Sequence, residues 1–191
     1  MRGFILTALS VLVVIALGVV GLDRGGIAQY VPLAANGEGY LSVGPGAVAW
    51  LTVRGSGNQL SGEGIVWENG GKCGDVRDVF ALCSKRFLLR LTRTDNQLVS
   101  AANHSGAATT WVIRPNALDE LTPGATPSVV VFARVSFAEY RHASALYAAL
   151  LAVMRRCFSS PSPRHSAPAI KRCDSDYQRA LKALSRAPGF L

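Results

Sequence analysis

The chain has 191 residues and a formal net charge of +8, with 49% hydrophobic and only 17% charged residues. This composition excludes a disordered chain, which would contain few apolar residues and a high density of charge. The positive charge is concentrated near the C-terminus, because residues 136–191 hold nine Lys and Arg against three Asp and Glu. We therefore expect an anionic partner for this part of the chain, with an ordinary solvated surface as the alternative.

The N-terminus carries a long apolar run, GFILTALSVLVVIALGVVGL, which covers residues 3–22 without a charge, a proline or an amide. A helix of this length spans the roughly 30 Å hydrocarbon core of a bilayer. The run is longer than the about 7–15 apolar residues of a secretory signal, so we expect an uncleaved signal anchor over residues 1–22, with cleavage after Ala28 as the alternative. Arg2 and the terminal amine favour a cytoplasmic N-terminus, which would place the rest of the chain outside the cytoplasm, in a periplasmic or extracellular location.

The four cysteines have no C-x-x-C spacing, which disfavours zinc ribbons and thioredoxin-like chemistry. In an exported domain an even number of cysteines favours disulfides. Pairing by proximity predicts Cys73–Cys83 and Cys157–Cys173, although the other two connectivities stay open.

A linker over residues 23–38 leads into a region of short apolar segments that alternate with turn signals. One of these segments alternates clearly, with Phe87, Leu89 and Leu91 expected inside and Arg86 and Arg90 outside. Hairpin-length turns join the segments and predict an antiparallel meander, either a curled sheet or a small barrel, over residues 39–135. The expected strands are residues 40–43, 47–54, 59–67, 86–93, 97–101, 107–114 and 128–135.

The C-terminal region, residues 136–191, is expected to be helical. Ser136 and Glu139 form a capping box, and the apolar residues after them recur at a 3-4 spacing as far as Phe158. This helix is expected to pack across the sheet, and pairing with a partner or with a second copy is the alternative.

A second capping box, Ser175 with Gln178, predicts a short helix after Cys173. The prolines within residues 159–169 disfavour a helix before it. The predicted fold class is therefore α+β, with a single N-terminal transmembrane helix, an antiparallel β domain and two C-terminal helices.

Motifs for catalysis are absent from the sequence, which has no G-x-S-x-G, H-E-x-x-H or phosphate-binding loop. We expect no metal and no cofactor. An enzyme would have to use Asp75, Asp78 and His104, which are the least improbable participants. The basic residues are not interleaved with aromatic ones as in a stacking platform, which disfavours nucleic acid as a partner.

These features predict a membrane-anchored extracytoplasmic binding or assembly subunit of a cell-envelope complex. Its expected partners are the lipid bilayer, other envelope proteins, and anionic polymers or headgroups. One alternative is a secreted or anchored cell-wall hydrolase. Another is a small-ligand carrier, which would need an interior too large for Trp50, Trp67 and Trp111 to fill.

Two contact surfaces are predicted for the binding subunit. The first is a stripe along the 137–158 helix, and the second is a basic patch at and beyond its end. The stripe comprises Phe137, Tyr140, Tyr147, Leu151 and Met154, and the basic patch comprises Arg155, Arg156, Arg164, Lys171, Arg172, Arg179, Lys182 and Arg186.

Overall fold

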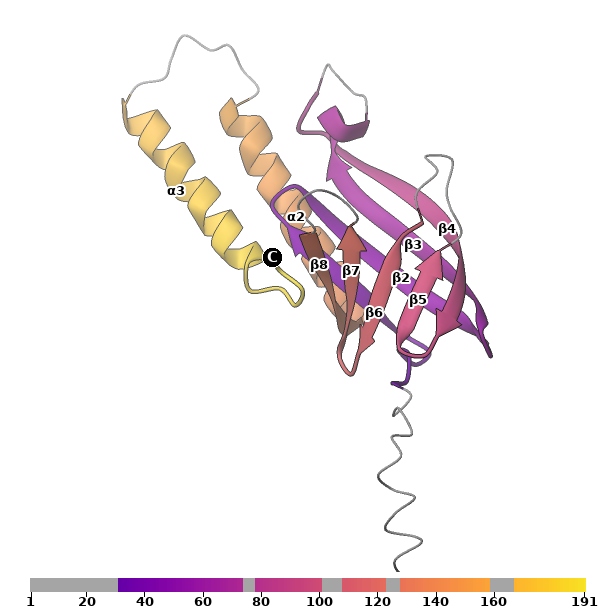
Figure 1. Ribbon diagram of the computed structural model, residues 1–191. Coiled ribbons are helices and arrows are strands. Elements are labelled where there is room, and N and C mark those ends of the chain that lie inside the picture. Colours follow the sequence, from indigo (N-terminus) through magenta and orange to yellow (C-terminus); the bar gives the residue numbers. More distant parts are fainter. Residues whose placement is uncertain (1–30, 74–77, 101–107, 123–127, 159–166) are drawn as a thin grey trace, which may run out of the picture. The chain divides into compact units, whose positions relative to one another are not determined.

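The computed structural model describes residues 31–73, 78–100, 108–122, 128–158 and 167–191, all of which belong to one compact unit (Figure 1). The segment predicted as an anchor, residues 1–22, lies outside these ranges. No helix within the described part of the chain is long and apolar enough to cross a membrane.

A closed antiparallel barrel forms the body of this unit. Each strand pairs with the next along the chain, and β8 returns to pair with β1, with Leu41 opposite Ala133. A 3-10 turn, η1 (Gly70–Cys73), lies between β3 and β4. The meander prediction is therefore confirmed in its closed form. The strands are β1 (Glu38–Gly44), β2 (Ala47–Ser56), β3 (Gln59–Asn69), β4 (Leu82–Thr94), β5 (Gln97–Ser100), β6 (Thr110–Arg114), β7 (Ala117–Thr122) and β8 (Ser128–Ser136).

The interior of the barrel is filled by side chains. The alternation expected along β4 is observed, since Leu91 is buried while Phe87 and Leu89 pack against the same core. Gly64 makes room for Phe87, because a Cβ at Gly64 would lie 2.1 Å from the ring. The interior core comprises Tyr40, Leu51, Val53, Leu60, Leu91, Leu98, Trp111, Ile113, Leu118 and Phe132.

Strand β7 was not predicted from the sequence, and its residues explain why. Leu118 is buried inside the barrel, but the next inward position is Glu120 and the outward position beyond it is the partly exposed Leu121. This order inverts the apolar alternation that marks a strand. Burial raises the pKa of the Glu120 carboxyl and so favours its neutral form. A neutral carboxyl costs less to bury than a charged one. The indole N–H of Trp111, which lacks a partner in hydrogen-bonding geometry among the described residues, is close enough to offset part of that rise.

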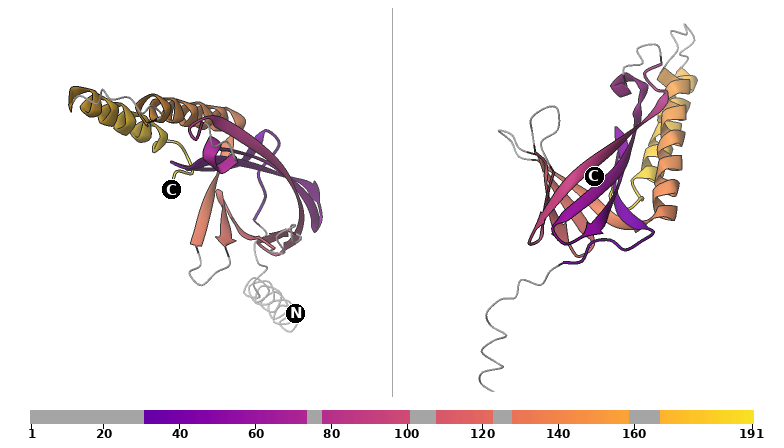
Figure 2. Two further views of the ribbon diagram at one scale, coloured as in Figure 1. Left: turned by 90° about the horizontal axis from the view of Figure 1, so that it is seen from above. Right: turned by 90° about the vertical axis from the view of Figure 1, so that its right-hand side faces the viewer.

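Two helices lie along the outside of the barrel, as Figure 2 shows: α2 (Phe137–Phe158) and α3 (Ala167–Leu184). The predicted capping box starts α2, with Ser136 N donating to Glu139 Oε2 at 2.7 Å and Glu139 N donating to Ser136 Oγ at 3.3 Å. The start predicted for α3 was wrong. The helix begins at Ala167, because Pro168 falls in its first turn, where a missing N–H costs no helical hydrogen bond.

A second core joins α2 to the outer wall formed by β1, β2 and β8. Tyr147 is fully buried in it and donates its hydroxyl to the carbonyl of Gly46 at 2.9 Å. The helix α3 packs on α2, and Leu184 closes this contact. The disulfide Cys157–Cys173 links the two helices as predicted, whereas the side chain of Cys73 lies outside the described residues.

The C-terminal segment returns to the barrel beyond α3. Val43 N donates to the carbonyl of Gly189 at 2.8 Å, and Leu191 N donates to the carbonyl of Val43 at 3.0 Å. Phe190 thereby forms a parallel bridge with Val43, beyond the point where β8 pairs with β1. The last residues thus extend the sheet at the seam of the barrel.

Candidate functional site

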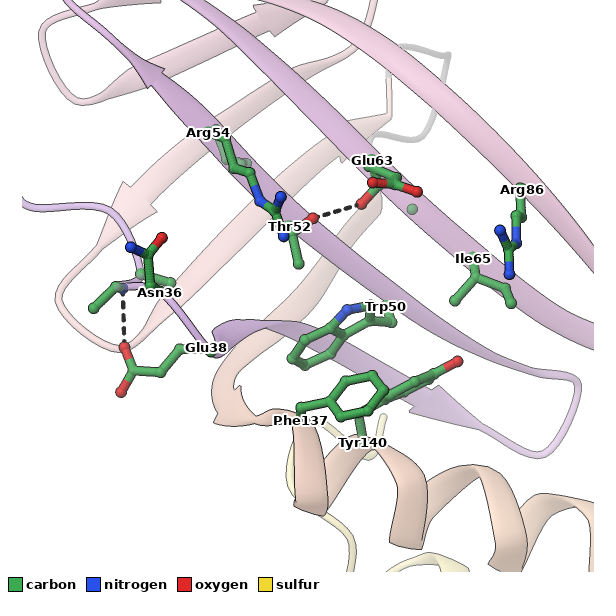
Figure 3. Close-up of a pocket in the computed structure, with 15 residues that line it drawn as sticks. Asn36, Glu38, Trp50, Thr52, Arg54, Glu63, Ile65, Arg86, Phe137 and Tyr140 are labelled. Carbon is green, nitrogen blue, oxygen red and sulfur yellow. Dashed lines mark hydrogen bonds between the residues drawn. The ribbon is translucent and has the colours of Figure 1, made fainter.

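A pocket of about 500 Å³ opens between the start of α2 and the outer wall of β2, β3 and β4 (Figure 3). We call it the barrel-wall groove. A smaller hollow continues from it past Trp67 and Ser144. The groove is lined by the segment 34–38 and by Trp50, Thr52, Arg54, Glu63, Ile65, Arg86, Phe137 and Tyr140.

One wall of the groove is aromatic. Trp50 points outward from β2 and stacks on Tyr140, with ring centroids 4.9 Å apart and an interplanar angle of 23°, while Phe137 meets its edge at 6.1 Å. Gly39 allows this position, because a Cβ there would lie 2.5 Å from Cζ2 of Trp50. Trp50 and Tyr140 are largely buried, but Phe137 is 52% exposed. The ring of Phe137 is therefore accessible to solvent, whereas the rings of Trp50 and Tyr140 behind it are held by packing.

A hydrogen bond and ring stacking hold the aromatic wall in place. Trp67 Nε1 donates to the hydroxyl oxygen of Tyr140 at 2.8 Å, which ties β3 to α2. Offset stacking of the kind seen between Trp50 and Tyr140 adds about 0.5–1.5 kcal/mol beyond the burial of area. These contacts hold Trp50 and Tyr140 in fixed positions.

The outer face of the sheet beside Trp50 carries charge. Thr52 pairs with Glu63 and Ile65 pairs with Arg86 in the sheet register, so the alternation of three adjacent strands places Arg54, Glu63 and Arg86 on one outer face (Figure 3). Within the described part of the chain, none of these three side chains forms an ion pair. Two guanidinium groups and one carboxylate are thus available to a ligand, and the cations are in excess.

The third side of the groove is the segment that leads into β1. Glu38 is occupied structurally, because its Oε2 accepts hydrogen bonds from Arg134 NH2 at 2.7 Å and from Ala35 N at 3.0 Å. The hydrogen bond from Arg134 lowers the pKa of Glu38. Ala34 N also donates to the hydroxyl oxygen of Tyr40 at 2.9 Å, which fixes this rim on the end of the barrel.

The residues of the predicted stripe separate into two environments. Phe137 and Tyr140 line the groove, whereas Tyr147 and Leu151 are enclosed between α2 and the barrel, and Met154 packs against the same core. Packing across the sheet accounts for the enclosed residues. The prediction of a contact surface along α2 stays open for its exposed members.

The predicted basic patch is partly neutralised. Arg155 pairs with Asp78, and both Arg156 and Arg179 pair with Asp176. The remaining described members of the patch are exposed, and Arg164 lies outside the described residues. These exposed members are Lys171, Arg172, Lys182 and Arg186.

The residues considered for an enzyme are not brought together in the described structure. Asp75 and His104 fall outside the described residues, and Asp78 is engaged by Arg155. No group of three or more potential metal ligands occurs in the ranges that the structure describes.

Sequence reasoning did not assign Trp50, Arg54, Glu63 and Arg86 to a site. They lie on three different strands, and only the register between those strands brings them together. The one available signal was the alternation along residues 86–93, which predicts that Arg86 points outward.

The fold and the groove define the described unit as a closed antiparallel meander barrel of strands β1 to β8, with the disulfide-linked helices α2 and α3 on its outer side and an aromatic and cationic groove beneath the start of α2. Comparisons with protein-family models, with curated proteins and with solved structures found no match. The functional conclusion therefore depends on the chemistry of the site.

Proposed function

We propose that this protein is a membrane-anchored extracytoplasmic binding module, and that the barrel-wall groove is its binding site. The apolar run of residues 3–22 supports the anchor, and the Cys157–Cys173 disulfide supports an oxidising compartment for the barrel. Assembly with other envelope proteins is the wider role that such a module would serve.

The observation that carries the proposal is the composition of the groove. Packed aromatic rings lie beside two guanidinium groups that have no ion-pair partner among the described residues. Ligand sites typically combine an apolar lining with a few polar groups that fix orientation. The ligand class is therefore a molecule or side chain with a ring or apolar part and an anionic group. Phe137 and Trp50 would contact the ring, and Arg54 and Arg86 would bind the anion.

The alternative functions receive less support. A carrier would hold its ligand inside the barrel, but Trp111, Phe132 and Tyr40 pack there, while Trp50 and Trp67 lie on the outer wall. A hydrolase would need an acidic cleft, and the described carboxylate Asp78 is already paired with Arg155.

The test uses a matched pair of probes that differ in charge, 1-naphthalenesulfonate and 1-naphthol, with the full-length protein in detergent micelles. The indole N–H signals of the three tryptophans are followed by NMR. The sulfonate is expected to shift the signals of Trp50 and Trp67, which border the groove and its extension, and to leave that of Trp111 inside the barrel unchanged. Naphthol should bind more weakly because it cannot engage the guanidinium groups.

Variants separate the groove from unspecific adsorption. The change Arg86→Gln should weaken sulfonate binding about tenfold, since a hydrogen bond to a charged group contributes about 1.5–3 kcal/mol and part of it is lost to solvent. The change Arg90→Gln removes the same charge from the same exposed face of β4, outside the groove lining, and should have no effect. Equal loss in both variants, or a shift of Trp111, would contradict the proposed site.

A further inference from the structure

Exposed apolar side chains gather at one end of the described unit. The exposed fractions are 45% for Val79, 40% for Leu82, 52% for Phe158 and 46% for Ile170. Single exposed apolar residues are ordinary on a protein surface. Val79 lies in the turn before β4, Leu82 begins β4, Phe158 ends α2 and Ile170 lies in the first turn of α3, and these element ends lie towards the same end of the unit in Figure 1. We call them, with Phe80, the apolar tip.

A hydrogen-bonded turn displays Val79 in the apolar tip. Ala81 N donates to the carbonyl of Asp78 at 3.0 Å, and Phe80 N donates to Asp78 Oδ1 at 3.2 Å, so Val79 stands at the corner. Turn corners usually carry polar residues, Gly or Pro, which makes an exposed valine at this position informative. The turn is therefore a formed element that holds an apolar side chain in solvent.

Contacts with α2 fix the position of this turn. Arg155 pairs with Asp78, and the rings of Phe80 and Phe158 lie 6.5 Å apart. Gly70 allows the approach, because a Cβ there would lie 2.1 Å from the carbonyl oxygen of Asp78. The turn and the end of α2, which are distant in the sequence, thus form one surface.

Cations without ion-pair partners in the described structure lie on the elements at the same end as the apolar tip. Lys171 and Arg172 lie in the first turns of α3, and Lys72 lies on η1; all three are exposed. Protein–protein interfaces are depleted of Lys, whereas apolar side chains with Lys and Arg around them are what holds proteins on anionic bilayers. The charge pattern therefore favours a lipid surface over a protein as the occupant.

We propose that the apolar tip docks on an anionic lipid surface, with Val79 and Phe158 inserted among the headgroups and Lys171 and Arg172 bound to headgroup phosphates. The chain enters the barrel unit at the other end of β4, where Val31 N donates to Asn96 Oδ1 at 3.0 Å. A strand of 13 residues separates the two ends by roughly 40 Å. The apolar tip and Val31, the first described residue, therefore lie near opposite ends of β4.

The experiment keeps the full chain in nanodiscs of phosphatidylcholine and measures its cosedimentation with large vesicles. We expect cosedimentation with vesicles that contain phosphatidylglycerol and none with vesicles of phosphatidylcholine alone. Each cation near an anionic surface contributes about a fivefold factor in partitioning, so Lys171→Gln with Arg172→Gln should lower it about 25-fold. Added salt should weaken binding in the same direction.

A matched variant on the same helix serves as the control. The changes Lys182→Gln and Arg186→Gln remove the same charge near the other end of α3 and should leave binding within a few-fold of the unaltered protein. Equal loss in the two double variants would indicate general charge attraction and overturn the proposal.

The apolar contribution is tested by Val79→Ser with Phe158→Ser, which retains every charge. Binding should fall at least tenfold while the circular dichroism spectrum and the Cys157–Cys173 disulfide stay intact. Vesicle binding that is insensitive to these changes, or no binding to phosphatidylglycerol vesicles, overturns the proposal. The variant Arg86→Gln should bind vesicles normally, so that failure of the groove proposal and failure of the tip proposal are told apart.

Discussion

Substitution of Gly189 by alanine is expected to detach the C-terminal segment from the barrel. Gly189 has a φ of +72°, and a Cβ there would lie 2.1 Å from the carbonyl oxygen of Leu41. That oxygen belongs to the backbone of β1 and cannot move aside without breaking the strand. The segment must move instead, which breaks the hydrogen bonds of Val43 N to Gly189 O and of Leu191 N to Val43 O.

The cost can be estimated against a matched position. Gly57 also has a positive φ, +66°, but nothing lies within 4 Å of a Cβ built on it. The left-handed backbone penalty of about 1 kcal/mol and the entropy change of the unfolded chain therefore occur in both variants. The excess for Gly189→Ala is about 2–3 kcal/mol, from two hydrogen bonds at about 1 kcal/mol each and the partial exposure of Phe190.

Thermal unfolding of the full-length protein, followed by circular dichroism, measures this excess. For a domain of this size 1 kcal/mol corresponds to about 2–4 °C, so Gly189→Ala should lower Tm roughly 4–12 °C further than Gly57→Ala. Deletion of residues 189–191 should cost about as much as Gly189→Ala, because the substitution already releases the segment. Equal Tm values for the two alanine variants would refute the role assigned to the C-terminal segment.

Two further predictions concern α2. The change Cys157→Ser opens a disulfide that joins residues 16 positions apart, and we expect a loss of about 3 kcal/mol in the free energy of unfolding measured with urea. Cys173→Ser opens the same disulfide and should cost the same, and clearly unequal losses in the two variants would contradict the assignment. Burial raises the pKa of Tyr147 to about 12, and the negative charge of Glu68 adds to the effect. Because that pKa lies above the value of about 10 in an unfolded chain, the stabilising contribution of the neutral phenol is complete below pH 10 and is lost as the pH rises towards 12. Tyr147→Phe should flatten this decline in urea titrations at different pH, leaving a remainder from Tyr40, whose pKa burial also raises; an unchanged pH profile would contradict the assignment.

Features that depend on neighbouring residues were predictable. The capping box of Ser136 and Glu139 acts within one helical turn, and the alternation of Phe87, Leu89 and Leu91 marks the inner face of a single strand. The Cys157–Cys173 pair was also predictable, because only a short stretch of chain separates the two residues.

Features that depend on two faces or on two strands were not predictable. Strand β2 is apolar on both sides, with Leu51 inside and Trp50 outside, so its pattern does not show which side faces the barrel. Strand β7 was missed because Glu120 is inward, and a buried carboxyl is acceptable only in the environment that the other strands supply.

The sequence by itself determined the local elements of this protein: the apolar N-terminal run, the alternation of short strands and turns, the helix start at Ser136 and the spacing of the cysteines. Only the tertiary structure decided that β8 closes on β1, that Arg54, Glu63 and Arg86 share one wall of a groove, and that the C-terminal segment completes the seam. The physical reason is the range of the interactions. Caps, turns and alternation are satisfied within a few residues, whereas the barrel register is set by the packing of all its strands at once.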